Sequence, residues 1–301
     1  MGSIAYVADE EMIEYHRLCG NREINFWRLS NQKNFTNFHV GDLLFFYTKV
    51  AFSNKKAFAG YAHFNSSRRM SIAEMWKRYN TSNGYDSIDK LTEAIQKASR
   101  DKPLPKKMDC LYLKEVVFFN EPVFPEEVGI DISSKLESYC YIDKNDPEVT
   151  IRILRKAEEH GIDLWSSAYS KETEEIFKHD EIRQGLCGIS KMLGKTEWTE
   201  SERKRAIKLM STFVKKNSFE YIIGSQTDVF TNQDGHIIIA LPFVFLSRNR
   251  SERKVSLAGR MALYKYYIKK ECIPVKSCTF QVVQITENED IKLLQEDINN
   301  E

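Results

Sequence analysis

The residues best suited to chemistry lie between positions 25 and 30 of the chain. In the stretch N-F-W-R-L-S, an amide (Asn25), an indole (Trp27), a guanidinium (Arg28) and a hydroxyl (Ser30) stand close together. An indole can stack on the face of a nucleobase while amide and backbone groups contact its Watson–Crick edge. We expect these residues to lie beside a loop rather than inside an alternating strand, and to line a base-binding pocket.

Two apolar runs supply further candidate pocket residues. Residues 43–49 form a continuous apolar-aromatic run of strand length, and residues 57–64 alternate as a second strand. Tyr47, Lys49 and Tyr61 are therefore the next candidates for the pocket wall. Since neighbours on a strand point to opposite faces, about half of the aromatic residues here must pack in the core.

Basic residues gather at three places. Arg68 and Arg69 follow the second strand, and two further basic segments, residues 203–216 and 248–270, contain few acids. A solvated helix face is the common explanation of such a run, but two runs in a protein with a net charge of +1 also favour a phosphate-binding surface. The candidate phosphate contacts are Arg68, Arg69, Arg203, Lys204, Lys208, Arg248 and Arg250.

The elements that must position these residues follow from local patterns. Ser71 with Glu74, and Thr199 with Glu202, have the spacing of a capping box, which predicts that helices start there. Residues 110–118 are expected to form a third strand. Residues 171–178 and 181–193 are expected to form two helices, the second interrupted by glycines, and the acidic tail 287–301 is expected to fray.

Several short motifs of the first half resemble a known domain. Its N-F-W-R segment, the G-D at Gly41 and the W-x-x-[FY]-x-x-x-N-G spacing from Trp76 to Gly84 resemble the PUA-like (EVE-type) domain fused to HNH nucleases in modification-dependent restriction endonucleases. The resemblance implies a β-barrel with helices that holds one flipped, often modified, base. It covers roughly the first half, and the HNH motif does not follow. Gly41-Asp42 is itself explained as a turn in which Asp42 accepts from backbone donors.

The second half has the αβββαβ outline of PD-(D/E)xK nucleases. Those enzymes hold Mg²⁺ with an Asp on one strand and an acid-x-Lys on the next. Asp228 is the candidate first ligand, but the following strand, H-I-I-I-A-L-P, offers neither an acid nor a Lys, so Asp228 is better explained as a hairpin residue. No phosphate-loop, dinucleotide, hydrolase or zinc-protease motif is present. We expect no cofactor and no bound metal, and we see no intact catalytic motif.

Composition limits the class of protein. The chain has 301 residues, of which 42% are hydrophobic and 29% charged, as in globular proteins. Its six cysteines are scattered without a C-x-x-C pair, which disfavours structural zinc and fits a reducing cytoplasm. Acidic residues at positions 9–11 do not resemble a signal peptide, and no segment has the apolar length of a membrane span.

These observations predict an α+β protein with a domain boundary at the turn-rich residues 143–147. Residues 1–145 would form a PUA-like base-binding domain, and residues 146–301 an α/β domain of unknown function. We expect a nucleic-acid-binding protein of a restriction or anti-phage system that prefers DNA, with a second domain that contacts the backbone, forms a homodimer or recruits an effector. The alternatives are a modification-dependent restriction endonuclease with a divergent nuclease domain, and a sensor of a free nucleotide.

Overall fold

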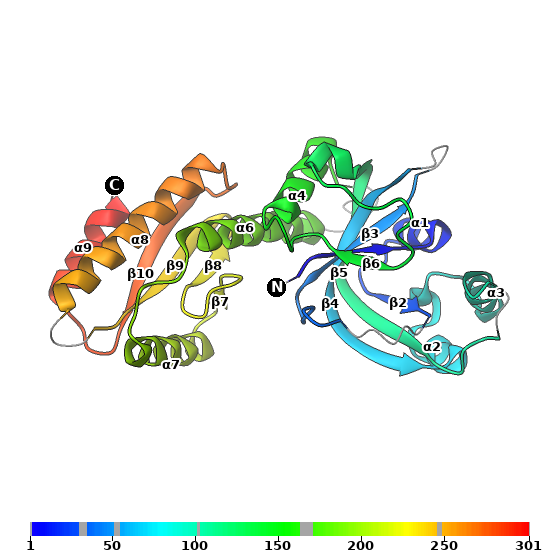
Figure 1. The fold of residues 1–301 in the computed structure, drawn as a ribbon, viewed down its shortest axis with the longest axis horizontal. Coiled ribbons are helices and arrows are strands. Elements are labelled where there is room, and N and C mark those ends of the chain that lie inside the picture. The colour runs from blue at the N-terminus through cyan, green and yellow to red at the C-terminus, as the bar shows by residue number, and fades with distance from the viewer. Residues whose placement is uncertain are drawn as a thin grey trace. The chain divides into compact units, whose positions relative to one another are not determined.

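The structure contains two compact units that both mix helices and strands. It is a computed structural model that describes residues 2–29, 35–50, 55–100, 103–162, 171–245 and 249–300. The units are Met1–Phe177 and Lys178–Glu301, and we call them unit 1 and unit 2 (Figure 1). Among the described residues, no helix is both long enough and apolar enough to cross a membrane.

Unit 1 is built on a six-stranded sheet with the order β2-β5-β4-β3-β1-β6. Strands β1 and β3 are parallel, and the other neighbours are antiparallel. These pairings leave β2 and β6 at the two edges, so the strands of the described ranges form an open sheet rather than the closed barrel that the resemblance implied. The strands are β1 (Ile4–Val7), β2 (Ile24–Arg28), β3 (Leu43–Lys49), β4 (Lys56–Met70), β5 (Met108–Val123) and β6 (Tyr139–Tyr141).

Strands β4 and β5 are long and curved (Figure 1). The register between them shifts at three places, and such bulges bend a strand and increase its twist. At Gly60 the two backbones approach so closely that a Cβ atom would lie 2.3 Å from the carbonyl oxygen of Val117. Both strands are longer than predicted, because the bulges interrupt the alternation on which the prediction relied.

Both faces of this sheet are covered by helices. Leu44 and Phe46 of β3 pack in a cluster with residues of α1 (Glu10–Leu18), α2 (Ile72–Tyr79) and α3 (Ile88–Ala98). Their neighbours Phe45 and Tyr47 pack in a second cluster with α4 (Val149–His160). A sheet covered on both faces explains the continuous apolar run of β3. Short 3₁₀ helices, η1 (Asn80–Asn83) and η2 (Pro125–Val128), complete the unit.

The packing of α4 also bears on the limits of the units. Because α4 belongs to the core of unit 1, this compact unit extends to residue 177. The boundary at residue 145 was drawn from turn residues alone. It stays a prediction about functional domains.

Unit 2 carries a four-stranded sheet with the order β10-β9-β8-β7. Strands β9 and β10 are parallel, and the other pairs are antiparallel. The order α7-β7-β8-β9-α8-β10 reproduces the expected αβββαβ outline. Helix α6 (Lys171–Leu193) begins in unit 1 and ends in unit 2. The other elements of unit 2 are α7 (Glu200–Lys216), β7 (Glu220–Tyr221), β8 (Val229–Gln233), β9 (His236–Phe243), α8 (Arg250–Lys270), β10 (Ser277–Gln284) and α9 (Glu289–Asn300).

The structure differs from the sequence-based expectations at two helices near unit 2. Residues 171–193 form the single helix α6, in which Gly185 packs so closely on Ile273 that a Cβ atom would lie 2.2 Å from its Cδ1. Residues 289–300 of the tail, which was expected to fray, form the helix α9, and α9 contacts the edge strand β10. Asn299 Oδ1 accepts a 2.7 Å hydrogen bond from the backbone N of Phe280, and Gln295 Oε1 accepts one of 2.7 Å from that of Val282. These side chains take the place of the missing neighbour strand.

Candidate nucleic-acid interface

A cavity of about 620 Å³ in unit 1 brings together two of the predicted pocket residues. Its wall comes from β1, β2, the start of α1, the end of α3, and the segments around residues 103–105 and 137–138. Trp27 and Arg28 both line it. The volume is within the range of small-molecule sites, about 300–1,000 Å³.

The segment that supplies these two residues is a strand, whereas a loop was predicted. Residues 24–28 form β2, which pairs with β5, and all five of its residues are buried. A strand with both faces covered shows no alternation of apolar and polar residues. The sequence pattern therefore did not indicate that residues 24–28 form a strand.

Arg28 is held at the cavity wall by an acid from the neighbouring strand. Its Nη2 lies 3.3 Å from Asp109 Oδ2, and its Cζ lies 4.4 Å from the centre of the Phe35 ring. The Arg28 side chain is only 6% exposed. Its Nε and Nη1 are buried without a hydrogen-bond partner among the described residues. A buried donor without a partner costs free energy, so an acceptor that reached these groups would stabilise them.

Trp27, which lines the same cavity, carries a third donor atom without a partner among the described residues. The residue is 8% exposed, and its Nε1 is buried without a hydrogen-bond partner in the described part of the chain. Indole and guanidinium groups only donate hydrogen bonds. These two side chains would match carbonyl oxygens or ring nitrogens of a ligand, and the carboxylates of Asp9 and Glu137 line the same cavity.

Asn25 has an architectural role. It is fully buried, and its Nδ2 donates a 2.8 Å hydrogen bond to Asn83 Oδ1. Asn83 Nδ2 in turn donates to the carbonyl oxygens of Met75 (3.2 Å) and Asn80 (2.7 Å). This pair of amides ties β2 to the end of α2, which explains the Asn in the W-x-x-Y-x-x-x-N-G spacing.

The other predicted base contacts lie away from this cavity. Tyr61 is fully buried in the cluster on the α4 side of the sheet. Tyr47 belongs to the same cluster and lines a different cavity of about 260 Å³ with Lys56 and Glu126. Lys49 is exposed at the end of β3, and Ser30 lies outside the described residues. The structure thus brings Trp27 and Arg28 together and separates both from Tyr47 and Tyr61.

Several cavity residues were not predicted, because they come from distant segments and no local pattern marks them. Tyr6 and Asp9 lie near the N-terminus, and Glu137 lies in a connection. The unpredicted polar and aromatic lining residues are Tyr6, Asp9, Ser99, Arg100, Glu137 and Ser138.

Asp42 performs the predicted turn function. Its Oδ2 accepts a 2.7 Å hydrogen bond from the backbone N of His39 and a 3.3 Å hydrogen bond from that of Gly2. Burial raises the pKa of this carboxyl group, and these donors oppose the effect. Gly41-Asp42 therefore anchors the N-terminus beside the start of β3.

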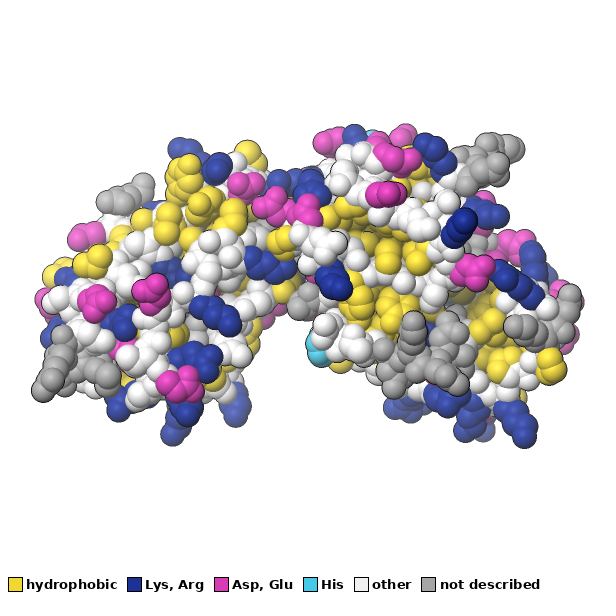
Figure 2. Space-filling model, in the orientation of Figure 1, with side chains coloured by type: hydrophobic (Ala, Val, Ile, Leu, Met, Phe, Trp, Pro, Cys, Tyr) yellow, Lys and Arg dark blue, Asp and Glu magenta, His cyan; other side chains and the backbone are white. Residues whose placement is uncertain are grey.

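The candidate phosphate contacts of unit 1 lie on one edge of that unit. Figure 2 shows Lys and Arg side chains gathered where Figure 1 draws the end of β4 and α2. Arg68 is exposed there. Arg69 is 65% exposed, and its Nε lies 3.4 Å from Asp109 Oδ1. Asp109 therefore contacts Arg69 on one side and Arg28 on the other.

The candidate phosphate contacts of unit 2 are partly compensated by acids. Arg203 and Lys204 lie 3.0 Å and 3.4 Å from the carboxylate of Glu200, and Arg250 lies 3.3 Å from that of Asp290. Lys208 is exposed, and Arg248 lies outside the described residues. Glu200, one turn away on α7, and Asp290, on α9, therefore make the net positive charge of these helices smaller than the basic runs in the sequence suggested.

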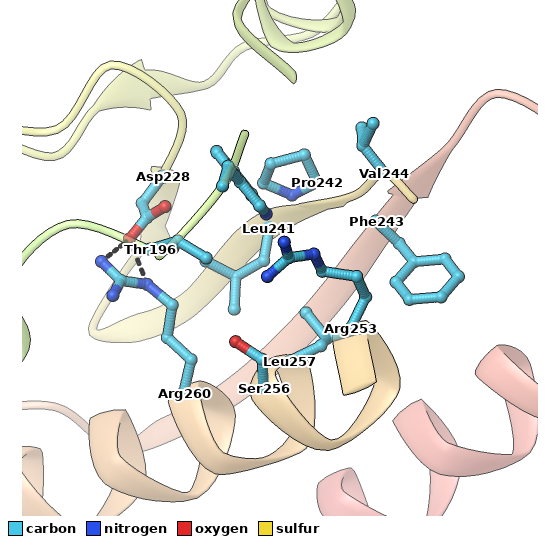
Figure 3. A pocket seen from close by; sticks show the side chains of 11 residues that line it. Thr196, Asp228, Leu241, Pro242, Phe243, Val244, Arg253, Ser256, Leu257 and Arg260 are labelled. Carbon is cyan, nitrogen blue, oxygen red and sulfur yellow. Dashed lines mark hydrogen bonds and ion pairs between the residues drawn. The ribbon is translucent and has the colours of Figure 1, made fainter. Parts of the chain in front are cut away.

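Asp228 contacts the guanidinium of Arg260 (Figure 3) and the hydroxyl of Tyr264, which are both on α8. It is 1% exposed, and its Oδ2 accepts hydrogen bonds from Arg260 Nε (2.9 Å), Arg260 Nη2 (2.6 Å) and Tyr264 Oη (2.8 Å). Among the described residues, no group of three or more His, Cys, Asp or Glu side chains could hold a metal ion. Asp228 lies in the connection of the β7–β8 hairpin, as predicted, where its carbonyl oxygen accepts a 2.9 Å hydrogen bond from the backbone N of Ile222. Its buried carboxylate also forms an ion pair with Arg260 of α8.

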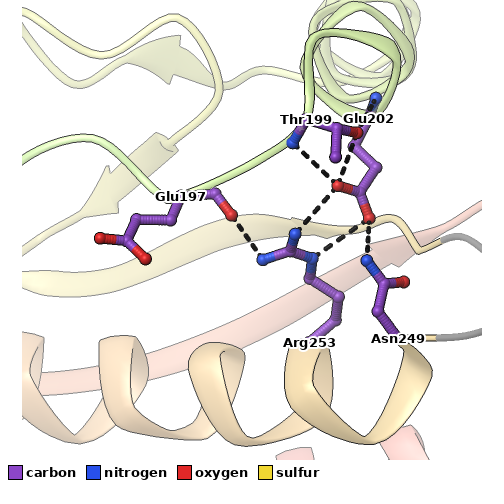
Figure 4. Close-up of polar contacts among 5 residues, drawn as sticks. All are labelled: Glu197, Thr199, Glu202, Asn249 and Arg253. Carbon is purple, nitrogen blue, oxygen red and sulfur yellow. Dashed lines mark hydrogen bonds and ion pairs between the residues drawn. The ribbon is translucent and has the colours of Figure 1, made fainter.

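A second buried ion pair joins α7 to α8 (Figure 4). Glu202 Oε2 lies 3.0 Å from Arg253 Nη2, and Asn249 Nδ2 donates a 2.9 Å hydrogen bond to Glu202 Oε1. The capping box with Thr199 forms as predicted. Burial would raise the pKa of Glu202, but the donors from Arg253, Asn249 and Thr199 outweigh it and lower the pKa to about 2.

Comparison with known proteins gives distant structural similarities. Neither a family model nor a curated protein matches the chain. The crystal structure of ASCH from Zymomonas mobilis is similar over 50% of this chain and 94% of its own, with 10% identity and a TM-score of 0.36. Two mutants of that protein give TM-scores of 0.36 and 0.38 over 52% of this chain and 98% and 96% of their own, at 11% and 10% identity.

Proposed function

We propose that unit 1 is a PUA-like nucleic-acid-binding module that accepts one flipped base in the cavity lined by Trp27 and Arg28. The observation that carries the proposal is the set of buried donors without partners at that wall, namely Trp27 Nε1 and Arg28 Nε and Nη1. A base supplies acceptors on its edge and a π-face for an aromatic ring. Both interactions strengthen when water is excluded.

The surroundings of the cavity suit a polyanionic ligand. Arg68 and Arg69 on β4 present guanidinium groups at the surface of the same unit, where they can contact phosphates and fix the register of a strand. DNA with a modified base is the first expected ligand, and a restriction or anti-phage system is the expected setting. Unit 2 would add backbone contacts or bind an effector protein.

The test is binding of the full chain to labelled duplexes that differ in one modified base, measured by fluorescence anisotropy at fixed salt. Trp27→Ala should bind the preferred duplex at least tenfold more weakly, because stacking one base contributes roughly 1–3 kcal/mol. Trp27→Phe retains a ring but lacks Nε1–H, so its affinity should fall between those of Trp27→Ala and the unsubstituted chain. Tyr266→Ala, at a ring 57% exposed on α8, is the control for loss of an aromatic side chain.

Two further comparisons separate the alternatives. The same sequence as RNA shows which backbone is preferred, and competition by the free modified nucleoside shows whether the cavity is a small-ligand sensor. Equal affinity of folded Trp27→Ala and the unsubstituted chain for every duplex would refute the proposal.

A further inference from the structure

Unit 2 contains its own cavity of about 410 Å³, independent of the one in unit 1. Its wall is formed by the end of α6, the connection to α7, the turn before β8, and one residue each of α7 and α8. Four of its described lining residues are basic, and none is acidic. The basic lining residues are Lys191, Lys195, Arg203 and Arg260.

The two lysines carry most of the free positive charge of this cavity. Lys191 and Lys195 are exposed, and neither side chain has a hydrogen bond or ion pair among the described residues. Among the described residues, the Arg203 side chain pairs with Glu200 alone, at the surface, where water weakens the attraction. A ligand phosphate can therefore recruit Arg203 as well.

Arg260 is a fixed part of the wall. Asp228 holds its Nε and Nη2, and its Nη1 donates a 3.1 Å hydrogen bond to the carbonyl oxygen of Gly194, just after α6 ends. That bond covers a carbonyl that would otherwise repel an anion at this helix end. The turn opposite is ordered by Ser225, whose Oγ accepts a 2.9 Å hydrogen bond from the backbone N of Asp228.

Trp198 gives the cavity a second recognition element. It is half-buried and lines the same wall as the cations. Inorganic phosphate needs only the charge, whereas a nucleotide uses both the charge and an aromatic face. From these features we propose that this cavity binds a nucleoside monophosphate, either free or as the 5′-phosphorylated end of a strand, with Lys191 and Lys195 on the phosphate and Trp198 on the base.

The test is isothermal titration of the full chain with AMP, adenosine, inorganic phosphate, and unmodified oligonucleotides with a 5′-phosphate or a 5′-hydroxyl. AMP should bind at least tenfold more tightly than adenosine or phosphate. Lys191→Gln/Lys195→Gln should weaken AMP binding at least tenfold. Lys215→Gln/Lys216→Gln is the matched control, since these exposed lysines lie about 18 Å along α7 from Arg203.

The same experiment distinguishes a free nucleotide from the 5′-phosphorylated end of a strand as the ligand. Preference for the 5′-phosphorylated strand over the 5′-hydroxyl strand assigns the cavity to strand ends, and AMP binding without that preference assigns it to free nucleotide. Equal AMP affinity in the two double variants would refute the proposed site. It would also be refuted if AMP and inorganic phosphate bound with equal affinity and Trp198→Ala left the AMP affinity unchanged. Because the strands lack modified bases and the substitutions lie in unit 2, failure here is distinct from failure of the cavity in unit 1.

Discussion

Arg28 and Asp109 lie directly opposite each other on the paired strands β2 and β5, and Arg28 Nη2 is 3.3 Å from Asp109 Oδ2. The pairing sets the orientation of a guanidinium whose other nitrogens remain unsatisfied at the cavity wall. A strand register thus positions a candidate ligand contact, with Asp109 as a positioning residue.

Asp109→Asn should weaken base binding by about threefold to tenfold, or roughly 0.7–1.4 kcal/mol, because Arg28 loses its charged partner. Affinity for the preferred duplex measures the effect. The same substitution should have little effect in an Arg28→Lys background, because the two changes act on one interaction. Asp89→Asn, at an exposed position of α3, is the charge-matched control. Additive losses in the double variant would mean that Asp109 acts independently of Arg28.

Glu202→Gln should destabilise unit 2 by about 3–5 kcal/mol, because it leaves the buried guanidinium of Arg253 without a counter-charge. Glu200→Gln, on the same turn of α7 and 60% exposed, should cost less than about 1 kcal/mol. Urea unfolding of the two variants measures the difference. Similar midpoints for both would show that the buried pair contributes no more than a surface pair.

The stabilisation by the Glu202–Arg253 pair should depend on pH. The pKa of Glu202 is about 2 in the folded chain, against an ordinary value of 4.5. The stabilisation is therefore complete above pH 4.5 and is lost as the pH falls towards 2. Glu202→Gln should remove this part of the acid-induced loss of stability, which urea midpoints across the acid range would show.

The buried His16 should make the stability of unit 1 depend on pH in a higher range, below 6.5. It is fully buried, and burial lowers its pKa from 6.5 to about 3. Between these values the unfolded chain binds a proton that the folded chain does not, so stability falls with pH by about 1.4 kcal/mol per unit below 6.5. Above 6.5 the residue has no effect. Urea unfolding at a series of pH values should show a flatter slope for His16→Gln than for the unsubstituted chain.

Gly60→Ala should destabilise unit 1 by about 3 kcal/mol, since the new Cβ would overlap the carbonyl oxygen of Val117 on β5. Gly188→Ala is the contrast, because no atom lies within 4 Å of the corresponding position in α6. That change should be neutral or stabilise by up to about 1 kcal/mol. Thermal unfolding measures the stability of the two variants. Equal effects would argue against the close approach of β4 and β5.

Local interactions were predictable from the sequence alone. The helix starts at Ser71 and Thr199 follow from hydrogen bonds between residues three apart, and both capping boxes form. The strand from Leu43 to Lys49 has the predicted bounds, and Asp42 binds backbone donors as its turn position indicates. Each of these features depends on a few neighbouring residues, which the sequence shows directly.

Only the tertiary structure decided which predicted residues share a site. Trp27 and Tyr61 are both buried aromatics, yet they belong to clusters on different faces of one sheet. Glu200 and Asp290 reduce the charge of the basic helices, and α9 is ordered by contacts with β10. These outcomes depend on strand register and on side chains far apart in the chain. A periodic pattern carries no information about such contacts, because they arise only when the elements pack.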